Sequence, residues 1–160
     1  MPKVVTIGVY GFTLDRFLDA LREADVRVLL DVRQRRGVRG REYAWANARR
    51  LQAALAAAGL EYRHHIELAP TTELRRLQYR EDDRRGVGRR SRVELAPAYR
   101  ERYVREILDR ADLDSIVREL PAAGAAALFC VERDPEACHR SLIAERIAAR
   151  GGVPVIHLRP

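Results

Sequence analysis

Short apolar runs alternate with helical patterns along most of the chain, and this alternation restricts the fold more than any other feature. The first run, "VVTIGVYG" at 4–11, is rich in β-branched residues and closed by glycine, which is typical of a buried strand. The run "VRVLLDVR" at 26–33 is apolar almost throughout, which indicates burial on both faces of a sheet. Between them, leucine and phenylalanine recur at helical spacing over 14–21, behind Thr13 as the predicted N-cap.

The same alternation continues through the rest of the chain. We expect a helix over 46–58, which Gly59 ends, and a short strand in "LEYRHHIEL" at 60–68. Helical patterns return after Pro97 and again over 113–120. The last three segments have the patterns of a strand, a helix and a strand: "AAALFCV" (125–131), "HRSLIAERIAAR" (139–150) and "VPVIHL" (153–158).

Strands that alternate with helices predict right-handed parallel crossovers. The predicted fold is therefore α/β: an open, three-layer, mostly parallel sheet of about five strands with helices on both faces, Rossmann-like. A length of 160 residues without a visible boundary in composition predicts one α/β domain over 1–160. Within it, about 66–97 has the composition of a basic insertion, because arginine is frequent and apolar residues lack a regular period. We interpret it as a mobile surface insertion or as a loop that orders over an anionic ligand.

The chain is basic, with a formal net charge of +7 at pH 7. Positive charge favours an anionic small molecule or a nucleic acid as partner, through electrostatic steering and counterion release. A chain rich in alanine, arginine, leucine and glycine is also typical of a GC-rich genome, so the charge alone does not decide the partner.

No apolar run approaches the roughly 18–20 residues that a membrane-spanning helix needs. The first residues lack the pattern of a secretory signal, so we expect a cytoplasmic protein with no membrane partner. Its two cysteines are expected to be free thiols, because a cytosolic setting disfavours disulfides. An uncovered edge strand would allow a homodimer.

Ligands of open α/β sheets bind beyond the carboxyl ends of the strands, so the residues that the strands carry there are candidates. They are Gly8 after the first strand, Asp31 and Arg33 after the second, and Cys130 and Glu132 after the fourth. This convergence of ionisable groups at one edge predicts a site more strongly than any single motif.

The loop "VERDPEA" at 131–137 separates the two cysteines and is the richest candidate. Its Asp-Pro pair predicts the start of a helix. Cys138 and His139 would then lie in the first turns, where the helix dipole favours a thiolate or a bound phosphate. Arg140 would offer a fork of donors to an oxyanion.

Helical spacing separates these groups. Cys138 and Ser141 would share one face, while His139 would be rotated away from Cys138 by about 100°. This predicts that Cys138 and His139 do not bind one metal ion, and we expect no metal site. Cys130 ends a buried strand, where a small core residue is expected more often than a nucleophile. Tyr99 and Tyr103, four residues apart, are expected to pack with hydrated hydroxyls.

Several stretches resemble a known family, catalogued as Domain of Unknown Function 488. They are "TIG" (6–8), "LLDVR" (29–33), "GLEYRHHIELA" (59–69), "CVERDPEACHRSLIAERIAARG" (130–151) and "VIHL" (155–158). The resemblance implies a compact bacterial or archaeal α/β domain and supplies no activity or cofactor. The residues that match the pattern of the family are Asp31, Arg33, Cys130, Glu132, Cys138, His139, Arg140 and Ser141.

The first strand departs from the pattern of the family. Relatives usually have "TIGHS", whereas Val9 and Tyr10 follow Gly8 in this chain. If that histidine transfers protons in relatives, its role is lost or moved here, because valine cannot transfer protons.

Two functions fit these observations. In the first, the chain is an enzyme that binds a phosphate-bearing or nucleotide-like ligand and hydrolyses or transfers a group. Arg33 and Arg140 would bind the anion, Glu132 or Asp31 would act as general base, and Cys138 or His139 would assist. The alternative is a non-catalytic nucleic-acid-binding module that uses the arginine-rich surface. Redox sensing by the two cysteines is a third interpretation.

Overall fold

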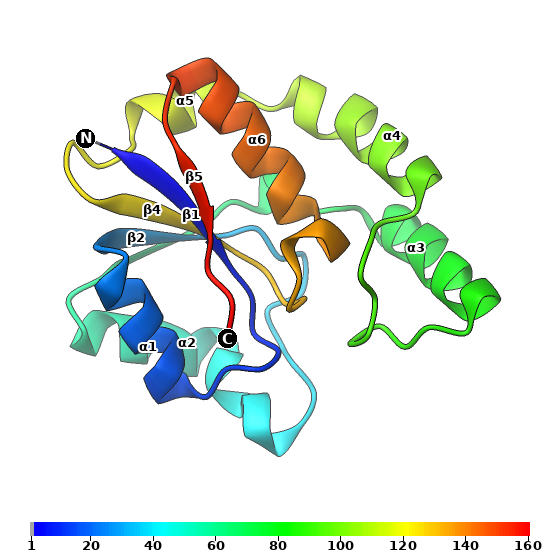
Figure 1. Cartoon of the computed structure of the whole chain (residues 1–160), viewed down its shortest axis with the longest axis horizontal. Helices are drawn as coiled ribbons and strands as arrows, with labels where there is room; N and C mark the ends of the chain where they lie inside the picture. Colours follow the sequence, from blue (N-terminus) through cyan, green and yellow to red (C-terminus); the bar gives the residue numbers. More distant parts are fainter. Residues whose placement is uncertain (1) are drawn as a thin grey trace.

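All five strands run parallel in one sheet, in the order β3-β2-β4-β1-β5, in a computed structural model that describes residues 2–160 (Figure 1). This confirms the predicted α/β class and strand number. The strands are β1 (Lys3–Ile7), β2 (Val26–Asp31), β3 (Glu61–His64), β4 (Ala125–Phe129) and β5 (Val155–His157).

The order of the strands follows their apolar content. The central strand β4 is "AAALF", and every residue of it is buried. Its neighbours β1 and β2 are buried at all but one position each, Lys3 and Arg27. The two edge strands β3 and β5 are short and contain no fully buried residue. Short edge strands limit the pairing of the sheet with other chains.

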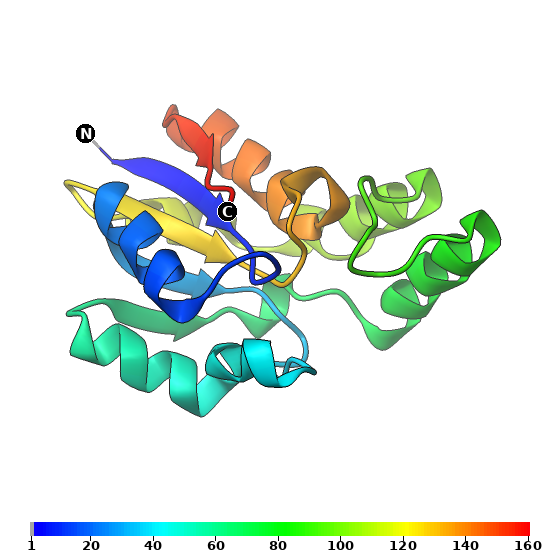
Figure 2. The same cartoon turned by 60° about the horizontal axis from the view of Figure 1, so that its bottom comes forward.

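Helices cover both faces of the sheet (Figures 1 and 2). One face is covered by α1 (Leu14–Glu23) and α2 (Ala48–Ala57), and the Thr13 side chain caps α1 as predicted. The other face is covered by α4 (Pro97–Glu106), α5 (Leu113–Arg118) and α6 (His139–Gly151). Among the described residues, no helix is long and apolar enough to cross a membrane.

Two hydrophobic clusters, one on each face, form the core. Phe17, Leu51 and Leu55 belong to the cluster under α1 and α2, together with Phe129 of β4. On the opposite face, Tyr103, Ile143 and Ile147 pack against Leu30 and Leu128. Successive side chains of a strand point to opposite faces and therefore enter different clusters. The face of each candidate residue determines which other side chains it can contact.

All strands are parallel, but the order in which the chain adds strands across the sheet reverses at β4. From β1 the chain runs to β2 and β3 at one edge, and then returns to β4 in the centre before it reaches β5 at the other edge. The segment that leaves β4 therefore diverges from those that leave β1 and β2. Ligands of open α/β sheets bind at such a reversal, so the loop after β4 lies in the expected place.

Residues 66–97 contain a helix that the sequence pattern did not predict. α3 (Thr72–Arg85) is capped by the Thr71 hydroxyl and ends at Gly86 in the left-handed conformation. Its buried positions are Leu74, Gln78 and Asp82. Two of these three residues are polar, so the apolar residues alone show no helical period. The prediction of an irregular loop is therefore wrong for Thr72–Arg85. α3 packs beside α4 at one end of the molecule (Figure 1).

A close approach of two loops requires glycine at position 8. A Cβ atom there would overlap the main-chain carbonyl of Glu132 and lie 3.3 Å from Arg140 Nη2. We expect Gly8→Ala to lower the free energy of unfolding by roughly 1–3 kcal/mol, because a main-chain loop must shift. Urea denaturation measures this, with Gly37→Ala as the control, since the nearest atom to its Cβ is 3.9 Å away. Equal losses in the two variants would contradict the packing argument.

Candidate functional site

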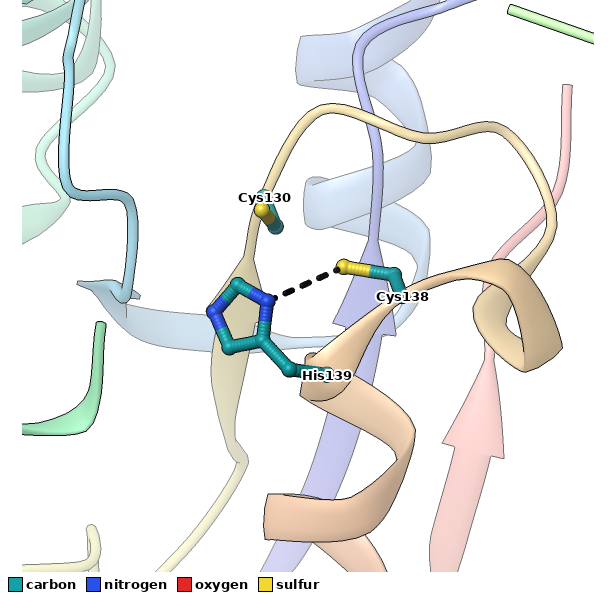
Figure 3. Close-up of side chains that lie close together, drawn as sticks. All are labelled: Cys130, Cys138 and His139. Carbon is teal, nitrogen blue, oxygen red and sulfur yellow. Dashed lines mark hydrogen bonds between the residues drawn. The ribbon is translucent and has the colours of Figure 1, made fainter. Parts of the chain in front are cut away.

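Three metal-ligating or nucleophilic groups converge beneath the carboxyl end of β4 (Figure 3). Cys130 directly follows β4, while Cys138 and His139 lie at the start of α6. The two sulfur atoms and a ring nitrogen of His139 all lie within 4.8 Å of one another. Cys138 Sγ is 3.7 Å from His139 Nδ1, and all three residues are buried. We call this set the Cys-Cys-His cluster.

α6 begins at His139, as the helical pattern over 139–150 predicted, and not at the Asp-Pro pair, and this changes the direction of Cys138. Pro135–Ala137 forms a separate 3₁₀ turn, and Cys138 is an extended N-cap residue with φ −139° and ψ 147°. A rotation of about 100° per residue applies only inside a helix. The prediction that Cys138 and His139 diverge is therefore wrong. Asp134, the expected cap, makes no side-chain cap bond and pairs with Arg159 at 3.3 Å.

The main chain just after β2 fixes the tautomer of His139. Nε2 lies 2.9 Å from the carbonyl oxygen of Val32. A carbonyl only accepts, so Nε2 carries a proton and donates it. When the ring is neutral, Nδ1 then presents its lone pair to Cys138. The Tyr103 ring packs against the imidazole with centroids 5.4 Å apart, which fixes the ring plane as well.

The pKa values within the cluster move in opposite directions. Burial raises the pKa of Cys138, but a hydrogen bond with Cys130 and the charges of His139 and Arg140 together hold it well below its usual range. The same hydrogen bond, with burial, raises the pKa of Cys130 well above its range. Burial lowers the pKa of His139, yet the charge of Cys138 raises it overall. The cluster therefore favours one thiolate, one thiol and a protonated imidazole.

Glu132 joins the cluster to the surface. Its carboxylate accepts a hydrogen bond from Arg92 Nη2 at 2.8 Å and keeps 21% of the side chain exposed. Burial and the nearby charge of Cys138 raise its pKa. Arg92 also donates to Asp82 at 3.3 Å and is itself buried. It belongs to the connection between α3 and α4, which lies beside the start of α6 in both views (Figures 1 and 2).

Arg140 and Ser141 bind the main chain of their own loop. The Arg140 guanidinium is fully buried and donates to the carbonyls of Glu132 at 2.6 Å and Arg133 at 3.1 Å. The Ser141 hydroxyl donates to the Cys138 carbonyl at 2.9 Å. Both residues were expected to contact a ligand, and here both hold the shape of the loop. Gly8 likewise gives room to the Glu132 carbonyl.

Asp31 and Arg33 lie on the opposite face of the sheet from the cluster. Arg33 Nε and Nη2 each donate to an Asp31 oxygen at 2.9 Å, and both side chains are buried. Tyr62 donates to the same carboxylate at 2.6 Å. The Arg33 guanidinium stacks on the Phe129 ring, in the α1/α2 core. The structure therefore does not bring Asp31 or Arg33 together with Glu132, Cys138 and His139.

Tyr99 and Tyr103 pack together as expected, but their burial and the role of Arg92 were not predicted. Tyr103 is buried and donates to the Leu68 carbonyl at 2.7 Å, so its hydroxyl is not hydrated as expected. Tyr99 is also buried, and burial with the charge of Tyr103 raises its pKa well above the usual range. Arg92 reaches Glu132 from a segment that was expected to lack order. The four-residue recurrence of Leu74, Gln78 and Asp82 is the signal that could have revealed α3.

An aromatic and basic surface borders Glu132. We call it the Tyr-Arg rim; it consists of Tyr10, Tyr43, Tyr79, Arg89 and Arg90. The rings of Tyr10 and Tyr43 are 5.2 Å apart, and the Arg90 guanidinium lies 5.0 and 5.3 Å from their centroids. Arg89 lies 3.7 Å over the Tyr79 ring. Tyr10 is close enough to Glu132 for its carboxylate charge, after burial, to raise the pKa of the phenol.

Comparison with known proteins gives one match. The sequence model of a family described as "Domain of unknown function DUF488" matches residues 13–147. No curated protein and no solved structure matches the chain. The match covers β2, β3, β4 and most of α6, and therefore includes the whole Cys-Cys-His cluster.

The Asp31–Arg33 pair is expected to stabilise the fold. Arg33→Met leaves a buried carboxylate without its charged partner, which we expect to cost roughly 3–5 kcal/mol of unfolding free energy. The double variant with Asp31→Asn should lose about 1–3 kcal/mol less than the sum of the single variants. Arg27→Met, at an exposed pair with Asp25, is the control and should cost less than about 1 kcal/mol. Additive effects of Asp31→Asn and Arg33→Met in urea denaturation would contradict the coupling.

Arg92 is expected to restrict access to the two thiols. In buffer with EDTA, Arg92→Gln should raise the rate of their reaction with DTNB about tenfold, because the α3–α4 connection loses its ion pairs to two carboxylates. Arg84→Gln removes an equal charge at an exposed ion pair and is the control. Urea denaturation of both variants separates local opening from global unfolding. Equal DTNB rates in the two variants would contradict the role of Arg92.

Proposed function

The chain belongs to the DUF488 family, whose description states no activity, and we propose that it binds a phosphate-bearing, nucleotide-like ligand beside Glu132. The proposed reaction is hydrolysis or transfer of a group of that ligand. The observation that supports this proposal most directly is the Tyr-Arg rim, which lies beside the loop after β4. The order in which the chain adds strands reverses at β4, and ligands of open α/β sheets bind at such a point.

The rim offers the two kinds of contact that such a ligand needs. Tyrosine faces stack on bases, and guanidinium groups bind phosphate in a fork geometry. Arg90 is oriented by the two tyrosine rings and by a hydrogen bond to the Arg39 carbonyl at 3.0 Å, so it is already ordered on the surface. Arg89 is exposed and stacked on Tyr79.

These arginines replace the ones that the sequence favoured. Arg33 and Arg140 are buried, and their guanidinium groups bond to protein oxygens. An anion would have to break those bonds and enter the core, at a large desolvation cost. Arg89 and Arg90 are exposed, and an anion at Arg90 would displace only a surface ion pair with Glu42 at 3.4 Å, so it avoids that cost.

Glu132 is the carboxylate that we assign to the chemical step. It lies between the rim and the Cys-Cys-His cluster and is partly exposed. In hydrolysis, water adds to the phosphorus atom, its proton passes to Glu132, the bond to the leaving oxygen breaks, and that oxygen takes a proton from solvent.

The alternative is a non-catalytic nucleic-acid-binding module. It is favoured by a row of exposed arginines on α3, namely Arg76, Arg80 and Arg84. Phosphates along a strand would bind such a row without a need for Glu132, and the affinity would fall steeply with salt.

Calorimetry with ADP, inorganic phosphate and a short single-stranded oligonucleotide tests the proposal. We expect ADP to bind, and Arg90→Gln or Tyr79→Leu to weaken it about tenfold or more. Arg22→Gln, which removes the same charge at an exposed pair on α1, is the control and should bind normally. Glu132→Gln should bind ADP but lose phosphate release.

Three outcomes would overturn the proposal. One is that neither ADP nor phosphate binds, and another is that Arg22→Gln weakens ADP as much as Arg90→Gln does. The third is that only the oligonucleotide binds, with an affinity that Arg80→Gln reduces and Arg90→Gln does not, which would establish the nucleic-acid alternative.

A further inference from the structure

We propose that Cys130, Cys138 and His139 bind one zinc ion. The inference concerns the buried cluster beneath the rim and does not depend on the ligand proposed for the surface. The sequence predicted no metal here because helical spacing separates Cys138 from His139, but Cys138 lies outside the helix, as its extended N-cap residue.

The distances suit a tetrahedral ion. Zinc binds cysteine sulfur at about 2.3 Å and histidine nitrogen at about 2.0–2.1 Å, which puts two such ligands of a tetrahedron about 3.6 Å apart. The observed separation of Cys138 Sγ and His139 Nδ1 is 3.7 Å. The remaining pairs lie within 4.8 Å, so shifts of about 1 Å or less complete the set. Figure 3 shows Cys138 and a ring nitrogen of His139 facing each other, with Cys130 beside them.

His139 has the second hydrogen bond that is usual for a metal ligand. Histidine ligands commonly donate their other ring N–H to a carbonyl or carboxylate, which fixes the coordinating nitrogen. His139 donates Nε2–H to the Val32 carbonyl at 2.9 Å. Nδ1 is therefore the nitrogen available to an ion, and it is the one that faces Cys138. The bond comes from the main chain of a buried strand end, so the ring is oriented before an ion binds.

The donor set also selects the ion and balances its charge. Thiolate and imidazole ligands favour zinc over magnesium or calcium, which prefer oxygen. Two thiolates, one neutral imidazole and a divalent ion sum to zero, which makes the burial of the set inexpensive. Three protein ligands leave a fourth position open, as in catalytic rather than structural zinc sites. Glu132 is the partly exposed neighbour of the cluster, close enough for the charge of Cys138 to raise the pKa of its carboxyl after burial.

Cobalt substitution of the whole chain tests the site. Under reducing conditions, we expect Co²⁺ to produce a thiolate-to-cobalt charge-transfer band that saturates at one equivalent and is displaced by Zn²⁺. Cys138→Ser, Cys130→Ser and His139→Gln should each weaken binding 10-fold or more, because a three-ligand site tolerates no loss. His64→Gln, a histidine of β3 outside the cluster, is the control and should bind cobalt normally.

A second measurement uses only the wild-type chain and so does not depend on the folding of variants. Protein loaded with one equivalent of zinc is treated with a mercurial reagent that blocks thiols, and the released zinc is followed with a chromogenic chelator. We expect release of one zinc per two thiols blocked. Absence of the charge-transfer band, its persistence in Cys138→Ser, or retention of zinc after both thiols are blocked would overturn the proposal. ADP binding is also measured on the metal-free protein. We expect it to be normal there, so that failure of the zinc site and failure of the rim can be told apart.

Discussion

The buried guanidinium of Arg140 holds the loop after β4, and the candidate site depends on the shape of that loop. The two hydrogen bonds to the carbonyls of Glu132 and Arg133 compensate for burying the charge. The 3₁₀ turn at Pro135–Ala137 follows this anchored segment, Cys138 is extended, and α6 starts at His139, which places Cys138 beside Cys130. Gly8 is part of the same constraint, because only a residue without Cβ allows the β1 loop to approach the Glu132 carbonyl.

The pleat of the sheet divides the ionisable groups into two sets. Cys130 enters the core under α4 to α6, while Asp31, one position out of phase on the neighbouring strand, enters the core under α1 and α2. The sequence placed both at one sheet edge, which is correct along the strands, but alternation puts them on different faces. Asp31 and Arg33 thus form a buried ion pair on one face, whereas Cys130 lies on the other face, where its hydrogen bond with Cys138 raises its own pKa.

The strands and the helices on both faces could be predicted from sequence, because apolar continuity and helical period report burial directly, whereas the order of the strands could not. Other parts of the site follow from main-chain geometry, which residue types do not encode locally. The start of α6 was misplaced because a proline fits a 3₁₀ turn as well as a helix. The orientation of His139 depends on the Val32 carbonyl, which every residue type would supply. α3 was missed because its buried face carries Gln78 and Asp82, which satisfy each other and the Ala96 amide.

One side chain links α3 to the loop that borders the buried cluster. Arg92 is shared between Asp82 of α3 and Glu132 of the loop after β4, so two carboxylates bind a single buried guanidinium. Because Arg92 belongs to the connection between α3 and α4, these two ion pairs hold that connection against the start of α6. The loop after β4 is therefore fixed from two sides, by Arg140 within its own segment and by Arg92 from the α3–α4 connection.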